Sequence, residues 1–298
     1  MIYYNRFTEY AWEEIMFKIL EKKNLAPNVF LVRVEAPRVA KAAQPGQFVI
    51  VIADEHAERV PLTIANFDRE VGWVDLVVQA SGPSTKKLSA KNKGDNLKDF
   101  VGPLGVPSDF TELSDDELKK KKFLFVGGGI GAAPVYPQVR YLSERGVHCD
   151  VIIGFKNKEA VIYEENFKEL NCDLYVCTDD GSYGFDGMVT KKIEDLIENE
   201  GKEYDTCVAI GPMIMMKFVC LTTKKYDLHT IVSLNPIMVD GTGMCGACRV
   251  SIDGETKFAC VHGPEFDGHK VDFDLAMKRQ RQYVNVEKNK GQDTGRDA

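Results

Sequence analysis

The stretch FLFVGGGIGAAPVYPQV, residues 123–139, decides the fold class of this chain. Its first four residues are all apolar, which is typical of a strand that is covered on both faces of a sheet. The glycines at 127, 128, 129 and 131 then form a turn that opens a helix. Such a turn lets backbone N–H groups approach a pyrophosphate closely. Because glycines at strand ends often serve only the turn, the stretch predicts a nucleotide site mainly through its place in a βα unit.

The residues that follow this turn repeat the alternation of strand and helix. The apolar runs are CDVIIGF at 149–155, LYVCT at 174–178 and TCVAIG at 206–211, and the helical stretches are about 133–144, 163–169, 187–199 and 212–222. This alternation predicts a doubly wound, parallel α/β sheet. In such a sheet, ligands bind beyond the carboxyl ends of the strands.

The residues before the turn have a different pattern. NVFLVRVEAP at 28–37, QFVIVIA at 47–53 and GWVDLVVQA at 72–80 are short runs with partial alternation, bounded by Pro, Gly and Asp. They predict a small antiparallel β-barrel. The polar stretch SDFTELSDDELKKKK at 108–122 is predicted to be a connection in which acids cap a helical turn.

The predicted organisation therefore has three folded parts and two ends. An N-terminal extension covers 1–15, the barrel 16–112, the α/β domain 113–230, a small Cys/Gly-rich module 231–286, and a solvated tail 287–298.

Composition excludes several classes of protein. The chain has 298 residues, 44% of them hydrophobic and 28% charged, as in ordinary globular proteins. A net charge of -7 argues against nucleic-acid binding, which needs a basic face. We expect no membrane span, because no apolar run approaches about 20 residues. The N-terminus lacks the basic and apolar regions of a secretory signal, so we expect a cytoplasmic protein with reduced thiols.

The loop IMVDGTGMCGACRV at 237–250 predicts a metal centre. Asp240, Cys245 and Cys248 have the spacing D-x4-C-x2-C, and eleven residues then separate Cys248 from Cys260. Plant-type [2Fe–2S] sites use C-x4-C-x2-C with a distal Cys, so the loop fits this frame with Asp240 in place of the first Cys. Glycines at positions 241, 243 and 246 would let the loop enclose a cluster.

Other interpretations of this loop remain open. Zinc accepts three thiolates and a carboxylate, and His262 offers a further zinc ligand. The C-x2-C pair is also a possible redox disulfide, although it does not open a helix. Asp240 could simply cap an Asp-Gly turn. The five other cysteines are scattered, and several of them lie in apolar strand-like runs, where they are predicted to be small buried apolar residues.

Two further strand ends and one barrel strand are candidates for ligand contacts. CTDDGSYG at 177–184 and AIGPMIMMK at 209–217 end apolar runs with turn residues. ERVPLTIANFD at 58–68 places Arg59 before a Pro-containing strand, and SGPSTKKLSAKNKGD at 81–95 opens a helix. Such a combination can hold a diphosphate, or it can be a surface arginine with a capped helix. The run after 155 offers Lys156, Asn157 and Lys158 in place of an acid, which does not distinguish NADH from NADPH.

Taken in order, these motifs resemble one family over nearly the whole chain from Met16. RVPLT at 59–63, PST at 83–85, GPLG at 102–105, VGGGIGAAP at 126–134, TDDGSYG at 178–184, GPMIMMK at 211–217 and ACVHGPEF at 259–266 are its motifs. They are similar to those of the ferredoxin reductase-related electron-transfer subunits. This family includes the flavin and iron–sulfur subunit of dihydroorotate dehydrogenase and the small subunit of NADH-dependent ferredoxin:NADP⁺ oxidoreductase.

The resemblance implies FAD, a [2Fe–2S] cluster and NAD(H) as cofactors. In the barrel it implies contacts from Arg59, Val60, Pro61, Leu62, Thr63, Val77, Gln79, Ser84 and Thr85. In the α/β domain it implies contacts from Gly127, Gly128, Gly129, Ile130, Gly131, Asp179, Asp180, Gly181, Gly211, Pro212 and Met213. Asp240, Cys245, Cys248 and Cys260 would be the cluster ligands. Hydride would pass directly between nicotinamide and flavin, so no catalytic acid or base is expected.

The resemblance also implies a partner. Dihydroorotate-linked members usually carry Cys where this sequence has Asp240, whereas the bifurcating enzyme is known for an Asp-ligated cluster. We therefore expect a heterodimer with a larger iron–sulfur flavoprotein that exchanges electrons among NADPH, NAD⁺ and, through that partner, ferredoxin. The alternatives are a dihydroorotate dehydrogenase subunit, a stand-alone flavin reductase with structural zinc, and a non-enzymatic nucleotide-binding module.

Overall fold

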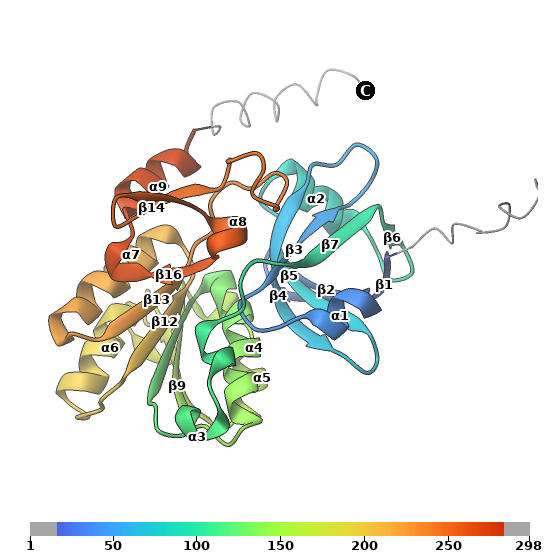
Figure 1. The fold of residues 1–298 in the computed structure, drawn as a ribbon. Coiled ribbons are helices and arrows are strands. Elements are labelled where there is room, and N and C mark those ends of the chain that lie inside the picture. The colour runs from blue at the N-terminus through green and yellow to red at the C-terminus, as the bar shows by residue number, and fades with distance from the viewer. Residues whose placement is uncertain (1–16, 283–298) are drawn as a thin grey trace, which may run out of the picture.

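The structure is a computed structural model that describes residues 17–282. Two seven-stranded sheets and one two-stranded ribbon make up its β structure. Figure 1 shows the antiparallel sheet and the α/β sheet side by side, with the C-terminal elements over the α/β domain. The predicted fold class, a barrel followed by a doubly wound α/β domain and a small module, is confirmed. The predicted extension at 1–15 and tail at 287–298 lie outside the described residues.

The antiparallel sheet forms a nearly closed barrel. Its strands are β1 (Phe17–Ala26), β2 (Val29–Glu35), β3 (Phe48–Ile52), β4 (Val60–Asp68), β5 (Trp73–Gln79), β6 (Asn96–Leu97) and β7 (Asp99–Leu104). They lie in the order β6-β1-β2-β5-β4-β3-β7. Because β6 and β7 are separated by Lys98 alone, the two edges of the sheet come together there. Helices α1 (Pro37–Ala42) and α2 (Pro83–Ala90) connect strands of this domain.

The α/β sheet is parallel, with one antiparallel edge strand. Its strands are β8 (Phe123–Gly128), β9 (Cys149–Phe155), β10 (Cys172–Thr178), β11 (Phe185–Asp186), β12 (Thr206–Ile210), β13 (His229–Ser233) and β16 (Glu265–Asp267). Their order is β11-β10-β9-β8-β12-β13-β16, and only β16 pairs antiparallel. β9, β10 and β11 follow one another on one side of β8, and β12 and β13 lie on its other side. The switch point between β8 and β12 is where doubly wound sheets bind ligands.

Helices cover both faces of this sheet, which explains its continuous apolar runs. They are α4 (Ala132–Ser143), α5 (Glu164–Lys168), α6 (Val189–Glu198) and α7 (Met213–Thr223). Phe125 of β8 packs in one core cluster with residues of α4 and α5. Its neighbour Val126 packs in a second cluster with residues of α6 and α7. Successive strand residues thus face opposite layers.

The connection between the domains is short and capped. It contains η1 (Asp109–Glu112) and α3 (Asp115–Leu118). The N–H of Glu117 donates to the Ser114 hydroxyl, and the N–H of Ser114 donates to the Glu117 carboxylate at 2.9 Å. This reciprocal pair is a capping box, so the predicted capped turn is confirmed.

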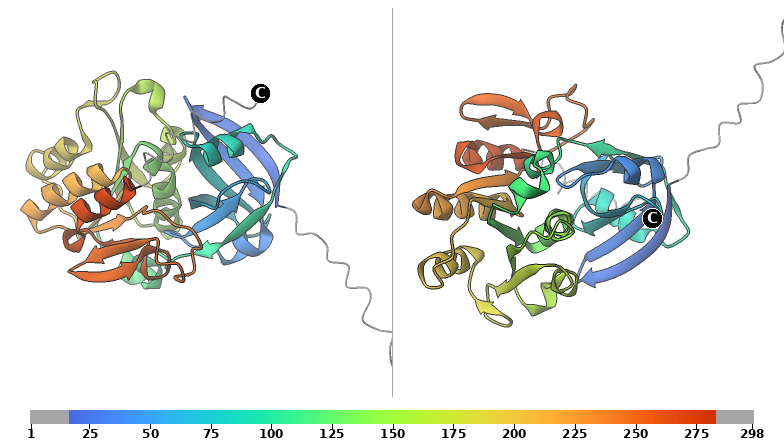
Figure 2. Two further views of the ribbon diagram at one scale, coloured as in Figure 1. Left: turned by 90° about the horizontal axis from the view of Figure 1, so that it is seen from above. Right: turned by 60° about the horizontal axis from the view of Figure 1, so that its bottom comes forward.

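The C-terminal module is attached to both domains, as the views in Figure 2 show. It contains β14 (Arg249–Ile252), β15 (Glu255–Phe258), α8 (Ala259–His262), η5 (Gly268–Lys270) and α9 (Phe273–Gln280). β16 joins the edge of the α/β sheet, and the predicted boundary at 230/231 falls within β13. Phe48 and Ile50 of the barrel pack in one cluster with Met238, Cys248 and Cys260.

The remaining short helices are single turns. They are η2 (Gly129–Gly131), η3 (Lys158–Ala160) and η4 (Lys224–Tyr226). Among residues 17–282, every helix is too short or too polar to pass through a bilayer.

Candidate functional site

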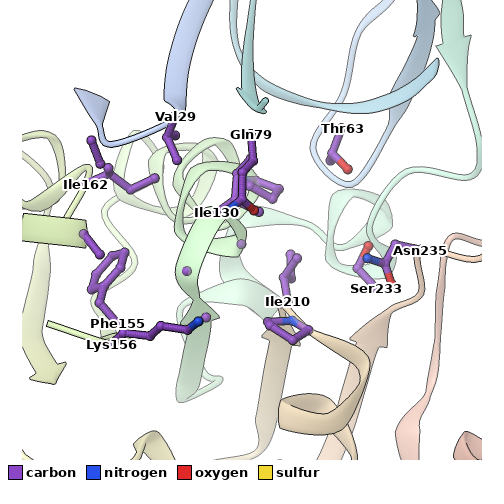
Figure 3. Close-up of a pocket in the computed structure, with 18 of the residues that line it drawn as sticks. Val29, Thr63, Gln79, Ile130, Phe155, Lys156, Ile162, Ile210, Ser233 and Asn235 are labelled. Atoms are coloured by element: carbon purple, nitrogen blue, oxygen red, sulfur yellow. The ribbon is translucent and has the colours of Figure 1, made fainter. Parts of the chain in front are cut away.

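A cavity of about 890 Å³ lies between the barrel and the carboxyl ends of the α/β strands. Figure 3 shows Thr63 and Gln79 facing it from the barrel, and Phe155 and Ile210 from the α/β sheet. Its lining comes mainly from apolar side chains and glycines. A pocket of this size at the switch point is the expected position for a nucleotide and a flavin.

The glycine turn after β8 forms one wall of this cavity. Gly128, Gly129 and Gly131 line it, together with Ile130. A Cβ at Gly131 would overlap the carbonyl oxygen of Ile210, so only glycine allows the turn to approach β12 this closely. Gly129 has φ +54°, and a Cβ there would meet no protein atom within 4 Å. Because α4 begins directly after this turn, its N-terminal N–H groups lie beside the cavity.

The predicted contact residues divide into two groups. Nine of them line the cavity: Pro61, Thr63, Gln79, Gly128, Gly129, Ile130, Gly131, Gly211 and Pro212. The others do not: Arg59, Val60, Leu62, Val77, Ser84, Thr85, Gly127, Asp179, Asp180, Gly181 and Met213.

Strand alternation explains part of this division. Pro61 and Thr63 of β4 point toward the cavity, whereas Leu62 between them packs against the barrel core. Val77 is buried in the core between the domains, and Met213 is buried in the core beneath α7. For Met213 this matches the core-filling role that its residue type favours.

The residues at the start of α2 serve the helix cap. The Thr85 hydroxyl accepts hydrogen bonds from the N–H groups of Ser81 and Gly82 at 3.1 and 3.0 Å. The Ser84 hydroxyl donates to Glu58 at 3.2 Å. The turn at 179–181 is likewise stabilised locally, because the Asp180 carboxylate accepts from the Ser182 N–H at 3.0 Å. Hydrogen bonds from Ser182, first from its side chain and then from its N–H, hold the pKa of Asp180 below its ordinary value.

The cavity also has lining residues to which the sequence did not point. Ser233 is the last residue of β13, Leu234 and Asn235 follow it, and Phe48 comes from β3. The signal for the first three was present, because SLNP ends an apolar strand and so stands at a carboxyl end. Phe48 reads as an ordinary core residue, and nothing in the sequence separates it from its neighbours.

The four predicted cluster ligands form two pairs, with Cys260 in α8 and the other three in the loop before β14. Cys248 and Cys260 are buried, and their Sγ atoms are 3.2 Å apart. Asp240 and Cys245 form the other pair, in which the Asp240 carboxylate accepts a hydrogen bond from the Cys245 N–H at 3.0 Å. Burial and the neighbouring Cys248 raise the pKa of the Cys260 thiol to about 12. The Cys245 side chain is exposed.

The backbone of the loop is shaped by glycines and by Asp240. Gly241, Gly243 and Gly246 all have positive φ, at +79°, +87° and +64°. The Asp240 carboxylate accepts hydrogen bonds from the N–H groups of Thr242 at 3.0 Å and Met244 at 3.2 Å, besides that of Cys245. These bonds, with Thr242 first, hold the pKa of Asp240 below its ordinary value. The acid therefore stays ionised while it caps the turn beside Cys245.

These donors fit a two-iron cluster better than a single metal ion. A single ion needs all its ligand atoms close together, and among residues 17–282 the three ligand atoms that lie within 4.8 Å of one another belong to His148, Asp150 and Asp173. Two adjacent donor pairs instead suit a centre with two metals. Cys248 approaches Cys260 and leads into β14, which disfavours a C-x2-C dithiol. His262 accepts a hydrogen bond from the Phe258 N–H at 2.9 Å, as an ordinary loop histidine does.

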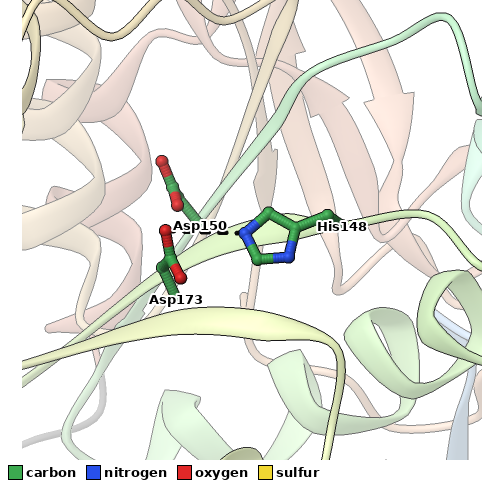
Figure 4. Close-up of side chains that lie close together, drawn as sticks. All are labelled: His148, Asp150 and Asp173. Carbon is green, nitrogen blue, oxygen red and sulfur yellow. Dashed lines mark ion pairs between the residues drawn. The ribbon is translucent and has the colours of Figure 1, made fainter.

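His148, Asp150 and Asp173 lie close together (Figure 4), at the amino ends of β9 and β10. The Lys202 ammonium is 2.9 Å from Asp150 and 3.1 Å from Asp173. The Tyr204 hydroxyl donates to Asp150 at 2.5 Å. Lys202 already pairs with both carboxylates and Tyr204 donates to one of them, so we interpret this group as a structural ion-pair network rather than a metal site.

The scattered cysteines have the structural role that the sequence predicts. Cys149, Cys177, Cys207 and Cys220 are buried, and Cys172 is partly buried. Burial raises the pKa of the Cys177 thiol to about 12, so it is an unreactive thiol.

Comparisons with known proteins agree with this geometry. The iron–sulfur cluster binding domain of dihydroorotate dehydrogenase B matches residues 235–272, and the oxidoreductase NAD-binding domain matches residues 125–221. A homologue of the dihydroorotate dehydrogenase B (NAD⁺) electron transfer subunit from Thermotoga maritima is 44% identical, over 91% of this chain and 93% of the relative. The chain belongs to the family of dihydroorotate dehydrogenase B electron transfer subunits and their homologues.

Two further members of the comparison are similar over most of their length. An uncharacterized protein from the adh 3′ region of Clostridium beijerinckii is 57% identical, over 91% of this chain and 92% of the relative. The structure of NADH-dependent reduced ferredoxin–NADP oxidoreductase, described for flavin-based electron bifurcation, is 42% identical with a TM-score of 0.85. That alignment covers 94% of this chain and 98% of the other.

The family assigns the chemistry of each domain. The chain is an oxidoreductase subunit for electron transfer, with a ferredoxin reductase-like fold and a C-terminal iron–sulfur domain. The predicted cofactors NAD(H), FAD and a [2Fe–2S] cluster are confirmed. Two thiols and a carboxylate in the glycine-rich loop, with a third thiol from α8, suit the cluster, and the cavity at the switch point suits the two nucleotides.

Proposed function

We propose that this chain is the NAD(H)-linked electron-transfer subunit of a flavin-based bifurcating complex. Its partner is a larger iron–sulfur flavoprotein, in a heterodimer that uses NADPH, NAD⁺ and ferredoxin. The relatives are electron-transfer subunits, which supports a larger partner. When bound, FAD and the cluster supply the conversion between two-electron and one-electron transfer.

One observation carries this proposal: the donor set of the ligand loop contains a carboxylate. Asp240 lies beside Cys245 and turns its carboxylate toward the loop, with hydrogen bonds from three main-chain N–H groups. Dihydroorotate-linked members usually have Cys at this position. The 42% identity to the bifurcating enzyme over nearly the whole chain supports the same branch.

The chain's own residues bind and orient the nucleotides. The turn at Gly128–Gly131 and the N-terminus of α4 receive a diphosphate, because unpaired N–H groups there favour an anion. Thr63 and Gln79 face the same cavity from the barrel and can hydrogen-bond a flavin or ribose. The apolar walls exclude water from the space between the domains.

A second candidate is the electron-transfer subunit of an NAD⁺-dependent dihydroorotate dehydrogenase. The description of the Thermotoga maritima relative, at 44% identity, favours it. Both candidates account for the barrel, the nucleotide domain and the iron–sulfur module of this chain. They differ in the residue that they expect at position 240, so the identity of the partner subunit decides between them.

Capture of the native complex tests the proposal. The tagged full chain is expressed in its own organism, purified without oxygen, and its co-purifying subunit is identified. We expect a larger iron–sulfur flavoprotein, and a complex in which NADPH reduces ferredoxin only when NAD⁺ is present. A complex that oxidises dihydroorotate would establish the second candidate. NADPH:ferredoxin activity of the isolated chain would contradict the proposed division of labour.

A further inference from the structure

The loop that carries Asp240, Cys245 and Cys248, here called the ligand loop, is attached to the barrel at Asp240. The Arg59 guanidinium donates through Nε to the carbonyl oxygen of Val239 at 2.7 Å. Through Nη2 it donates to the carbonyl oxygen of Asp240 at 3.2 Å. Arg59 stands just before β4 in the barrel, about 180 residues away along the chain. Two hydrogen bonds from one planar cation fix both the position and the direction of the main chain that they reach.

A second contact secures the other side of Asp240. Gly241 is buried with φ +79°, and a Cβ there would lie 2.6 Å from Cδ1 of Ile50 and 2.9 Å from Cδ1 of Leu104. The loop therefore lies directly on β3 and β7 at this glycine. Asp240 stands between two attachments to the barrel, while its carboxylate accepts N–H groups of its own loop.

We infer that Arg59 is a positioning residue for the iron–sulfur site. Acting from the barrel, it holds the main chain at Asp240 so that the carboxylate is presented to the cluster in one orientation. This rests on the proposed role of Asp240 as a ligand. The main chain around Cys248 and Cys260 is held separately, by the β14–β15 ribbon and α8.

This role is compatible with the predicted contact between Arg59 and FAD. A guanidinium has five N–H donors, and the loop uses two of them. Both interactions would then depend on one side chain in the flavin domain. We therefore expect a substitution at Arg59 to change the spectrum of the cluster even when a chemical reductant, and not FAD, reduces the cluster.

The test is the electron paramagnetic resonance (EPR) spectrum of the dithionite-reduced cluster in the full chain, purified without oxygen. Arg59→Lys keeps the charge and loses the two-pronged geometry. We expect the iron content to be retained, and the signal to shift and broaden because the carboxylate ligand becomes heterogeneous. Arg69→Lys is the matched control, because Arg69 also donates to a barrel carbonyl, that of Ala43 at 2.7 Å. It should leave the signal unchanged.

Gly241→Ala repeats the test from the loop side, in case Arg59→Lys fails to fold. Its matched control is Gly254→Ala, because Gly254 has the same φ of +79° with no atom within 4 Å of an added Cβ. We expect Gly241→Ala to change the cluster signal and Gly254→Ala to leave it unchanged. If Gly254→Ala also changes the cluster signal, backbone strain at a positive φ explains the effect without any contact to the barrel, and the inference is wrong.

Two results separate this inference from the proposed function. If Arg59→Lys lowers only the FAD content and the cluster signal stays as in the wild type, Arg59 serves the flavin alone and the inference is wrong. If Asp240→Cys also leaves the signal unchanged, Asp240 is not a ligand, and the proposed function loses its main support together with the inference.

Discussion

The Gln138 side chain of α4 donates a 2.7 Å hydrogen bond to the partly buried Glu265 carboxylate of β16. The Ser108 hydroxyl, from the connection after the barrel, donates to the same oxygen at 3.1 Å. Glu265 therefore joins three parts of the structure. Burial raises its pKa from 4.5 to about 7, against the opposing effect of the two donors. Gln138 Oε1 has no partner among the described residues.

This raised pKa predicts a pH dependence of stability. The folded state keeps the proton on Glu265 up to about pH 7, whereas an unfolded glutamate loses it near pH 4.5. The contribution is thus complete below pH 4.5 and is lost as the pH rises through about 7, and the total loss of stability is about 3 kcal/mol. Glu265→Gln should remove this part of the dependence, measured by urea denaturation between pH 5 and 8. The exposed Glu70→Gln should retain it, and an unchanged slope in Glu265→Gln would show that Glu265 is ionised throughout.

The second prediction concerns a buried ion pair in the barrel. Arg33 binds Asp75 through two hydrogen bonds of 2.7 and 2.8 Å, and these residues face each other on β2 and β5. Arg33→Met leaves the buried Asp75 carboxylate without its partner, so we expect the free energy of unfolding at pH 8 to fall by about 3 kcal/mol. The loss should be smaller at pH 5, where Asp75 can take up a proton. The double variant Arg33→Met/Asp75→Leu should recover most of the lost free energy of unfolding. If the losses of the two single variants simply add in the double variant, the two side chains do not stabilise each other.

The third prediction separates two glycines of the turn after β8. Gly131→Ala would clash with the Ile210 carbonyl, so it should lower the free energy of unfolding by about 2–3 kcal/mol. Gly129→Ala meets no protein atom and should cost about 1 kcal/mol for its positive φ. Its methyl group would stand beside the cavity, and we expect NADH to bind about tenfold more weakly, as measured by titration.

Gly82→Ala is the control for both variants, because Gly82 has negative φ and open space around an added Cβ. Equal NADH affinity in Gly129→Ala and Gly82→Ala would show that the glycine turn does not contact the bound nucleotide.

Much of the fold could be predicted because its signals are local. The run at 123–126 shows burial on both faces, and the four predicted helical stretches overlap α4, α5, α6 and α7. β16 could not be predicted as part of that sheet. Its three residues pair with β13 about 30 positions earlier, and such pairing leaves no periodic signal in so short a strand.

The candidate site was predictable where residue type and spacing carry the chemistry. Asp240 and the three cysteines have a ligand spacing, and the structure pairs Asp240 with Cys245 in the loop and Cys248 with Cys260 of α8. The link from Arg59 to the Asp240 carbonyl could not be predicted, because main-chain acceptors are present at every residue. Glu265 reads as an ordinary acid, and only the packing of three chain segments around it raises its pKa.

The measurement that tests the central claim most directly is the EPR spectrum of the reduced, anaerobically purified full chain, with Asp240 changed to cysteine. We expect the wild type to contain two irons per chain, and Asp240→Cys to keep them with shifted g-values, because a thiolate replaces an oxygen ligand. Wild-type protein without iron, or a spectrum that is identical in Asp240→Cys, would contradict an iron–sulfur centre ligated by Asp240.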